Sequence, residues 1–224
     1  MATKSAQERT RLVDHFKRAY QIIVGLSITL ACTKLFPAFT LSIDMSFWLF
    51  CIFFITVVPV FQGGDRSLDI KYLERRPKGF LGHFAYVWDV FMLLITAILF
   101  VKIAQTIPVA DASKANTGLI GLPSPATPES FYRWMAIMLF VDVAILIIDW
   151  IKSNYLKIES AAKLSSYLLW IIMNSVLGAV CLAASDPCPF IASISPAWLS
   201  FGIFGLALTR TFLDYVFGAE FMFP

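Results

Sequence analysis

Six apolar runs, each about as long as a membrane-spanning helix, constrain this sequence more than any other feature. A helix needs ~20 apolar residues to cross the hydrocarbon core of a bilayer. The runs cover residues 20–36, 42–61, 80–103, 131–151, 166–185 and 198–217. Only 15% of the 224 residues are charged, whereas a soluble domain carries about 25%. The sequence therefore predicts an all-α, polytopic membrane protein with six transmembrane helices.

The residues before the first run are polar and basic. Ser5 and Glu8 stand in the capping-box pattern, which predicts that a helix begins there and leads into the first span. Three parts are expected: a cytoplasmic basic amphipathic helix over 1–19, a six-helix transmembrane domain over 20–218, and a short C-terminal tail over 219–224. The chain outside the predicted spans is too short for a second domain.

The basic residues are distributed unevenly between the two sides of the predicted membrane. Thirteen Lys and Arg residues fall in the N-terminal arm and in the second-to-third and fourth-to-fifth connections, against four in the other connections. Cytoplasmic loops carry the excess of Lys and Arg in membrane proteins. We therefore expect both termini in the cytoplasm and residues 104–130 outside.

Five charged residues lie in the halves of the apolar runs nearer the predicted cytoplasm, where charge is expensive unless it is paired or hydrated. Counting inward at 1.5 Å per residue places Asp89, Asp142 and Arg210 in one layer, roughly 11–14 Å deep. Asp149 and Asp214 form a second layer nearer the cytoplasm. Asp214 follows Arg210 at i+4, so the two share a helical face. We expect Arg210 to pair with Asp214 and, across helices, with Asp89 or Asp142.

This count sets four carboxylates against one guanidinium, an imbalance that protonation, water or cations must neutralise. A hydrated path for cations or protons satisfies it. The alternative is that Asp149 and Asp214 reach the headgroups, which leaves a small structural cluster. Asn174, in the middle of the fifth run, is a further pathway candidate, although a buried Asn also joins helices. Gly202 and Gly205 are expected to allow close helix contact in the sixth run.

The connection after the second run is basic. Gly63-Gly64 is predicted to end that helix, and a separate short helix is expected over 65–76 with Asp65 as its cap. Its basic side chains would contact anionic headgroups or receive an anionic ligand such as a nucleotide or nucleic acid. The residues proposed for this contact are Arg66, Lys71, Arg75, Arg76 and Lys78.

Residue types that support catalysis or metal binding are scarce. His15 and His83 are the only histidines, in different segments, and the four cysteines form no Cys-x-x-Cys pair. A zinc site or a His-based triad needs more than this. We expect no enzyme activity, metal or cofactor.

The compact six-span plan and the stretch Arg210-Thr-Phe-Leu-Asp-Tyr215 resemble the small multi-pass effectors of bacterial anti-phage defence, which permeabilise the inner membrane. The resemblance implies a homo-oligomeric channel gated from the cytoplasm by a partner protein or a nucleotide signal. The leading hypothesis is thus a small oligomeric cation or proton channel. A proton-coupled transporter of a small solute, or a structural membrane subunit, is the alternative.

Overall fold

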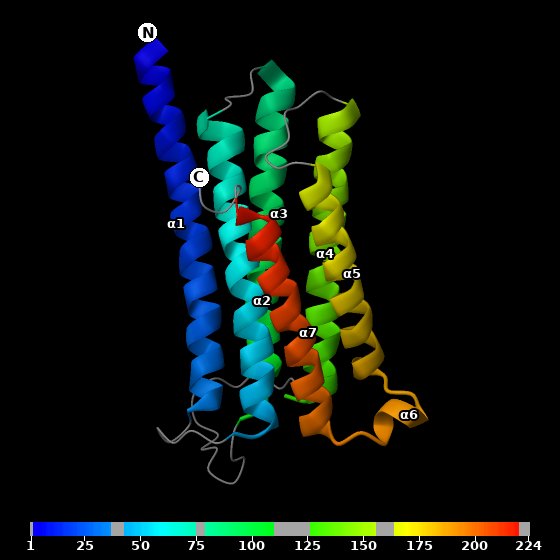
Figure 1. Cartoon of the computed structure of the whole chain (residues 1–224). Coiled ribbons are helices and arrows are strands. Elements are labelled where there is room, and N and C mark those ends of the chain that lie inside the picture. The colour runs from blue at the N-terminus through cyan, green and yellow to red at the C-terminus, as the bar shows by residue number, and fades with distance from the viewer. Residues whose placement is uncertain (1, 37–42, 75–78, 110–125, 156–163, 220–224) are drawn as a thin grey trace.

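The chain forms a bundle of long helices (Figure 1). The computed structural model describes residues 2–36, 43–74, 79–109, 126–155 and 164–219, and these contain no β-strand. The elements are α1 (Ala2–Leu35), α2 (Met45–Leu68), the π-helix η1 (Asp69–Glu74), α3 (Gly79–Thr106), α4 (Pro128–Tyr155), α5 (Leu164–Ser185), the short α6 (Pro189–Ala192) and α7 (Pro196–Phe217).

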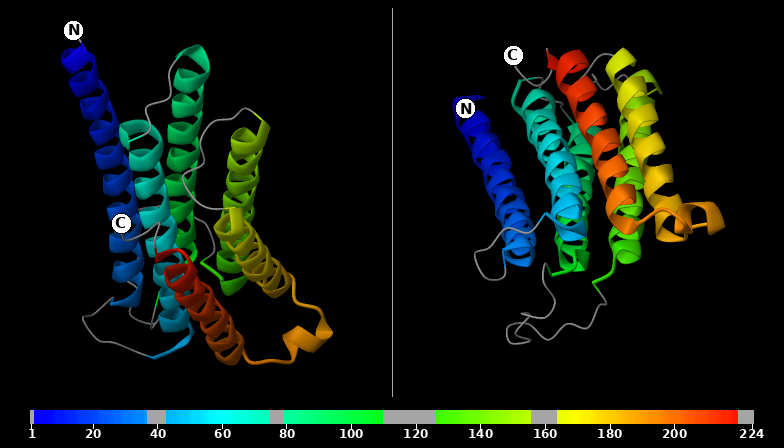
Figure 2. Two further views of the ribbon diagram at one scale, coloured as in Figure 1. Left: turned by 45° about the horizontal axis from the view of Figure 1, so that its top comes forward. Right: turned by 60° about the horizontal axis from the view of Figure 1, so that its bottom comes forward.

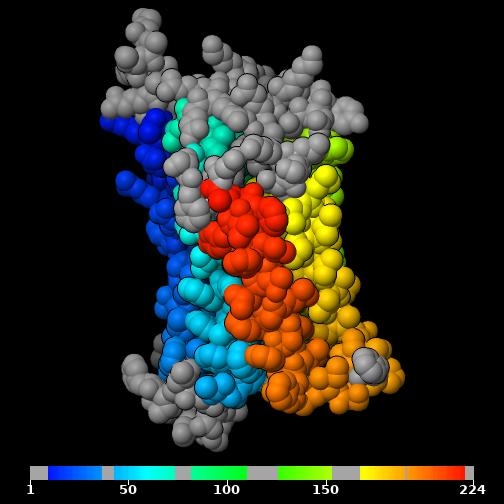
Figure 3. All heavy atoms as spheres, in the orientation of Figure 1, coloured from blue at the N-terminus to red at the C-terminus, as the bar shows by residue number. Residues whose placement is uncertain are grey.

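The long helices pack as a closed ring of neighbours. α1 contacts α2 and α3, α2 contacts α7, α7 contacts α5, and α4 joins α5 to α3. Consecutive long helices run antiparallel, so α1 begins and α7 ends toward the same end of the bundle (Figures 1 and 2). Figure 3 shows α7 lying between α2 and α5 on one face of the molecule. Segments distant in sequence, such as α2 and α7, thus meet across the bundle.

Five helices are long and apolar enough to cross a membrane. They cover Met45–Leu73, Gly82–Thr106, Pro128–Lys152, Tyr167–Ser185 and Pro196–Phe217. Large apolar side chains lie exposed on their outer faces, among them Phe91, Ile98 and Phe212, as is expected where the surroundings are lipid. The chain is therefore built as a multi-pass membrane protein. The sixth predicted span, within α1, is not among the five.

α1 joins the predicted N-terminal arm and first span in one continuous helix. It lies beside α2 and α3, and its apolar half exposes Ile22 and Leu26 at 71% and 58%. Lys17 ties α1 to the end of α2 through ion pairs to Asp65 and Asp69 at 2.9 and 2.8 Å. Burial alone would lower the pKa of Lys17, but the hydrogen bonds and negative charges of Asp69 and Asp65 raise it above the usual lysine value.

The prediction that Gly63-Gly64 ends the second helix is wrong. The helix continues through both glycines to Leu68, and η1 extends it to Glu74, so no separate helix begins at Asp65. The reason is packing between helices: a Cβ added to Gly64 would lie 2.6 Å from Cδ2 of Leu93 on α3. The missing side chain lets α3 approach, which offsets the ~0.5–1 kcal/mol that glycine costs inside a helix.

The prediction that Gly202 and Gly205 allow close contact between helices is wrong. Nothing lies within 4 Å of a Cβ added to Gly202 or Gly205, so these two do not serve helix packing among the described residues. Gly178 does, because its added Cβ would lie 3.3 Å from the Phe140 ring and 3.4 Å from Leu139. The sequence pattern alone cannot tell which face of a helix meets a neighbour.

Candidate functional site

A cavity of about 110 Å³ lies inside the bundle, between α2, η1, α3, α4, α5 and α7. This volume is large enough for several water molecules or a small solute. α1 contributes no residue to its wall. All six side chains predicted for the pathway line the cavity, namely Asp89, Asp142, Asp149, Asn174, Arg210 and Asp214. We refer to it as the central cavity.

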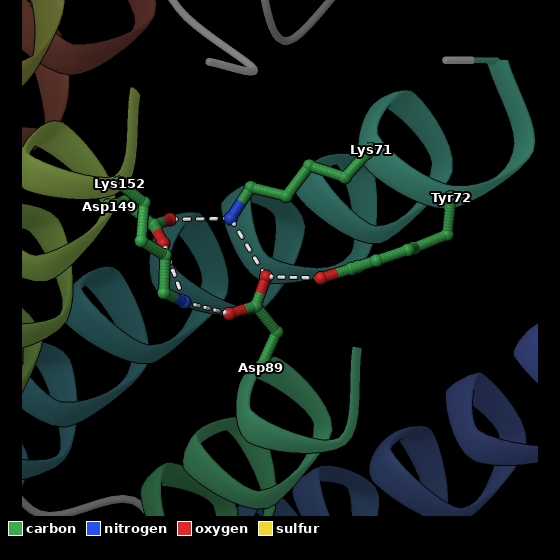
Figure 4. Close-up of polar contacts among 5 residues, drawn as sticks. All are labelled: Lys71, Tyr72, Asp89, Asp149 and Lys152. Carbon is green, nitrogen blue, oxygen red and sulfur yellow. Dashed lines mark hydrogen bonds and ion pairs between the residues drawn. The ribbon is translucent and has the colours of Figure 1, made fainter. Parts of the chain in front are cut away.

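Two lysines and two aspartates form a closed network beside the cavity (Figure 4), and three of them, Lys71, Asp89 and Asp149, line it. Nζ of Lys71 lies 3.0 Å from Oδ2 of Asp89 and 2.5 Å from Oδ2 of Asp149. Nζ of Lys152 lies 2.8 Å from Oδ1 of Asp89 and 3.5 Å from Oδ1 of Asp149. Each carboxylate therefore contacts both ammonium groups. We name these four residues the lysine–aspartate quartet.

The quartet joins three elements that are distant in the sequence. Lys71 comes from η1, Asp89 from α3, and the other two members from α4. Tyr72 adds a fifth contact, because its hydroxyl donates a hydrogen bond of 2.8 Å to Asp89 Oδ2. The four charged side chains are only 11–16% exposed. Separating the three elements would leave some of these charges uncompensated away from solvent, which is costly, so the network resists opening.

The quartet corrects the charge balance drawn from the sequence. Lys71 and Lys152 were assigned to the cytoplasmic connections, yet both turn inward and neutralise Asp89 and Asp149. Four carboxylates thus face three basic side chains, leaving an excess of one negative charge and not three. Continuation of α2 into η1 explains the difference, because it carries Lys71 to the side of α3 and α4.

The predicted layers are also wrong. Asp89 lies with Asp149 in the quartet and not with Asp142 and Arg210. Depth was counted from the predicted helix ends, on the assumption that these ends are level, whereas α3 begins well beyond the point where α4 ends (Figure 1). Asp142 and Asp149, seven residues apart, both line the cavity and so share one face of α4.

The second group of polar side chains is built around Asn174, which is fully buried on α5. Its Nδ2 donates to Asp142 Oδ2 at 2.6 Å, and its Oδ1 accepts from Nε of Arg210 at 2.9 Å. The amide therefore links a carboxylate of α4 to a guanidinium of α7. We name this group the arginine cluster; its members are Asp142, Asn174, Arg210 and Asp214.

Arg210 pairs with Asp214 within α7, as predicted, at 3.8 Å between Nη1 and Oδ2. The predicted cross-helix partner Asp89 instead belongs to the quartet, and Asp142 is joined to Arg210 through Asn174. Asp214 also accepts a hydrogen bond of 2.5 Å from Nε1 of Trp170 on α5. Asp214 is 5% exposed, so it does not reach toward headgroups, and neither does Asp149.

The basic set predicted for an anionic ligand is only partly described. Lys71 points inward and is occupied by the quartet, which excludes it from such a surface. Arg66 is half-buried within α2. Arg75, Arg76 and Lys78 lie outside the described residues, and their contact with an anionic ligand stays a prediction.

Metal ligands do not converge among the described residues of this site. In the described part of the chain, no group of three or more His, Cys, Asp or Glu side chains is arranged to hold a metal ion. His15 and His83 are exposed, on α1 and α3. What the arrangement offers is a set of buried hydrogen-bonding and charged groups around a small space.

Sequence reasoning found the acidic side of this site and missed four of its members: Lys71, Lys152, Tyr72 and Trp170. One signal was present for Lys152, which follows Asp149 at i+3 and shares its helical face. No comparable signal marks Lys71, because its partners are 18 and 78 residues away. No family model, curated protein or solved structure matches this chain, so its function must be inferred from this geometry.

Proposed function

We propose that this protein is a proton-coupled transporter that carries a small solute across the membrane through the central cavity. The observation that supports this most is the cavity itself, which lies inside one chain and is lined by charged groups from α3, α4, α7 and η1. A cavity formed within one bundle needs no second copy to complete its wall. Pores of symmetric oligomers need no such internal site.

Asp142 is the residue that we propose as the proton carrier. Asp89, Asp149 and Asp214 each contact a Lys or an Arg, whereas Asp142 is hydrogen-bonded to the neutral amide of Asn174. The four carboxylates on the cavity wall exceed their basic neighbours Lys71, Lys152 and Arg210 by one negative charge, and a single proton on Asp142 would remove it. Binding and release of one proton thus changes the cavity from charged to neutral.

The quartet is the proposed gate on the cytoplasmic side. It binds η1 to α3 and α4 on the wall of the cavity, and η1 is a π-helix. Short π-helical segments inside helices occur frequently at functional sites. In the proposed topology α1 is the first of six spans, both termini are cytoplasmic, and the bundle lies in a bacterial inner membrane. Opening requires Lys71 to leave Asp89 and Asp149.

The test is uptake of radiolabelled small solutes into proteoliposomes that contain the purified full chain. The panel includes amino acids, hydroxy acids and sugars, with and without an imposed proton gradient. We expect at least one solute to accumulate only when the gradient is present. Asp142→Asn should abolish this accumulation while the protein remains folded, because the amide keeps the size of the side chain and its hydrogen bond to Asn174.

The matched control is Asp14→Asn, which makes the same change at an exposed position on α1 and should leave uptake intact. Planar-bilayer recordings of the same protein test the channel hypothesis directly. Unitary currents without gradient-driven uptake would contradict the transporter and favour an oligomeric channel. If neither current nor uptake is found and Asp142→Asn alters only stability, the charges are structural.

A further inference from the structure

One guanidinium nitrogen at the cavity is left without a hydrogen bond. Arg210 is 4% exposed. Its Nε is occupied by Asn174, whereas Nη1 has no hydrogen-bond partner among the described residues. Asp214 Oδ2 lies 3.8 Å from Nη1, beyond hydrogen-bonding distance. Leaving a buried charged donor unsatisfied is costly, and Arg210 lines the cavity. Nη1 is itself buried, so a ligand in that space would supply the missing acceptor once the guanidinium turns toward it.

Lys71, the other basic residue on the wall, already contacts two carboxylates, and Lys152 beside it contacts the same two. Much of the remaining wall is apolar, and its side chains include Val60, Met92, Leu93, Ile145 and Leu146. A ligand that fits this wall has one anionic end and a small apolar body. A second anionic group on the ligand would find no unused cation.

We infer that the central cavity binds a small organic acid through a single carboxylate, which accepts a hydrogen bond from Nη1 of Arg210. A guanidinium suits this role because its planar fork of N–H donors matches the two oxygens of a carboxylate. The apolar body lies against Met92, Leu93 and Ile145. As a statement about a transported substrate, this inference rests on the proposed function.

Carboxylate binding and proton binding are then linked by charge. Asp142 faces Asn174 on α5, Arg210 and Asp214 on α7, Asp149 on α4 and Tyr20 on α1, with Lys71 and Asp89 also on the cavity wall. A carboxylate entering beside ionised Asp142 and Asp214 adds a third negative charge around one arginine. A proton on Asp142 removes one of these charges, so the acid and the proton bind together.

Calorimetric titration of the purified full chain tests this with L-lactate and benzoate, each compared with its neutral amide. We expect both acids to bind, more tightly at mildly acidic than at neutral pH, and both amides to bind far more weakly. Arg210→Gln should weaken acid binding by roughly tenfold to a hundredfold, the size of one charge-assisted hydrogen bond. Arg210→Lys keeps the charge and loses the fork, so it should also weaken binding.

A second variant keeps the test decisive if changes at Arg210 prevent folding. Asp142→Asn imitates the protonated carboxyl, so its affinity for L-lactate should match that of the wild type at acidic pH and no longer change with pH. Equal affinity for acids and amides, or unchanged pH dependence in Asp142→Asn, would overturn the inference. Proton-driven uptake of a neutral or cationic solute without acid binding would remove the carboxylate site and leave the proposed transporter standing. Acid binding at Arg210 without any proton-driven uptake would support the carboxylate site and contradict the proposed transporter.

Discussion

Asn174 hydrogen-bonds two side chains of opposite charge, one on each of two other helices. Replacement by leucine keeps the approximate size but leaves Asp142 and the Arg210 Nε without these partners. We expect Asn174→Leu to lower the free energy of unfolding by about 1–3 kcal/mol for each group left unsatisfied. Unfolding in mixed detergent measures this. Ser175→Ala, at the half-buried neighbouring position, is the control, and an equal loss in both variants would contradict the linking role.

The lysine–aspartate quartet can be tested by substituting single residues and then combining the substitutions. Lys71→Met leaves two carboxylates to share Lys152, and breaking a buried ion pair in this way costs about 3–5 kcal/mol. Asp149→Leu combined with Lys71→Met leaves Lys152 and Asp89 as a neutral pair 2.8 Å apart, so the double variant should be more stable than Lys71→Met alone.

Arg18→Met, at an exposed position of α1, is the control for the lysine change and should be nearly neutral. Unfolding curves of the wild type, Lys71→Met, Asp149→Leu and the double variant form a double-mutant cycle. Additive losses in that cycle would show that Lys71 and Asp149 do not interact, and the quartet would be wrong.

At the scale of the elements, the continuous helix from Met45 to Glu74 determines the site, because it carries Lys71 to α3 and α4. Gly64 permits this by letting Leu93 approach. Gly64→Val should displace the Leu93 side chain from its packed position and lower stability by about 1–3 kcal/mol, as overpacking does. The same change at Gly205, where an added Cβ meets nothing within 4 Å, should be tolerated. Thermal unfolding measures the melting temperatures of both variants. Equal melting temperatures would contradict the close packing at Gly64.

The topology of the whole molecule is tested by cysteine labelling with an impermeant reagent on intact bacterial cells. Native cysteines are first replaced, since Cys188 is exposed. We expect Ser113→Cys to be labelled, and Ser5→Cys and Ser160→Cys to be protected, because six spans place 104–130 outside and both termini inside. Labelling of Ser5→Cys with Ser113→Cys would show that α1 does not cross the membrane. Labelling of Ser160→Cys but not Ser113→Cys would reverse the orientation.

The long helices were predictable from the sequence, because an apolar run in lipid must satisfy its backbone hydrogen bonds within itself. The predicted runs at 80–103, 131–151, 166–185 and 198–217 each lie within one observed helix. The six candidate pathway residues were also found from the sequence, and all of them line the cavity. An ionisable side chain deep inside an apolar run almost always faces the bundle interior, so its presence indicates its direction.

The tertiary structure alone decided which charges meet. Pairing depends on the relative heights and rotations of the helices, and a sequence read one helix at a time contains neither. The long, flexible lysine side chain adds to the difficulty, because it carries its charge several bonds away from the backbone position that the pattern locates. Lys71 and Lys152 therefore belonged to the cytoplasmic count in the sequence and to the buried quartet in the folded chain. Thus the local pattern of apolar and polar residues determined what spans and what faces inward, whereas long-range packing determined the charge of the site.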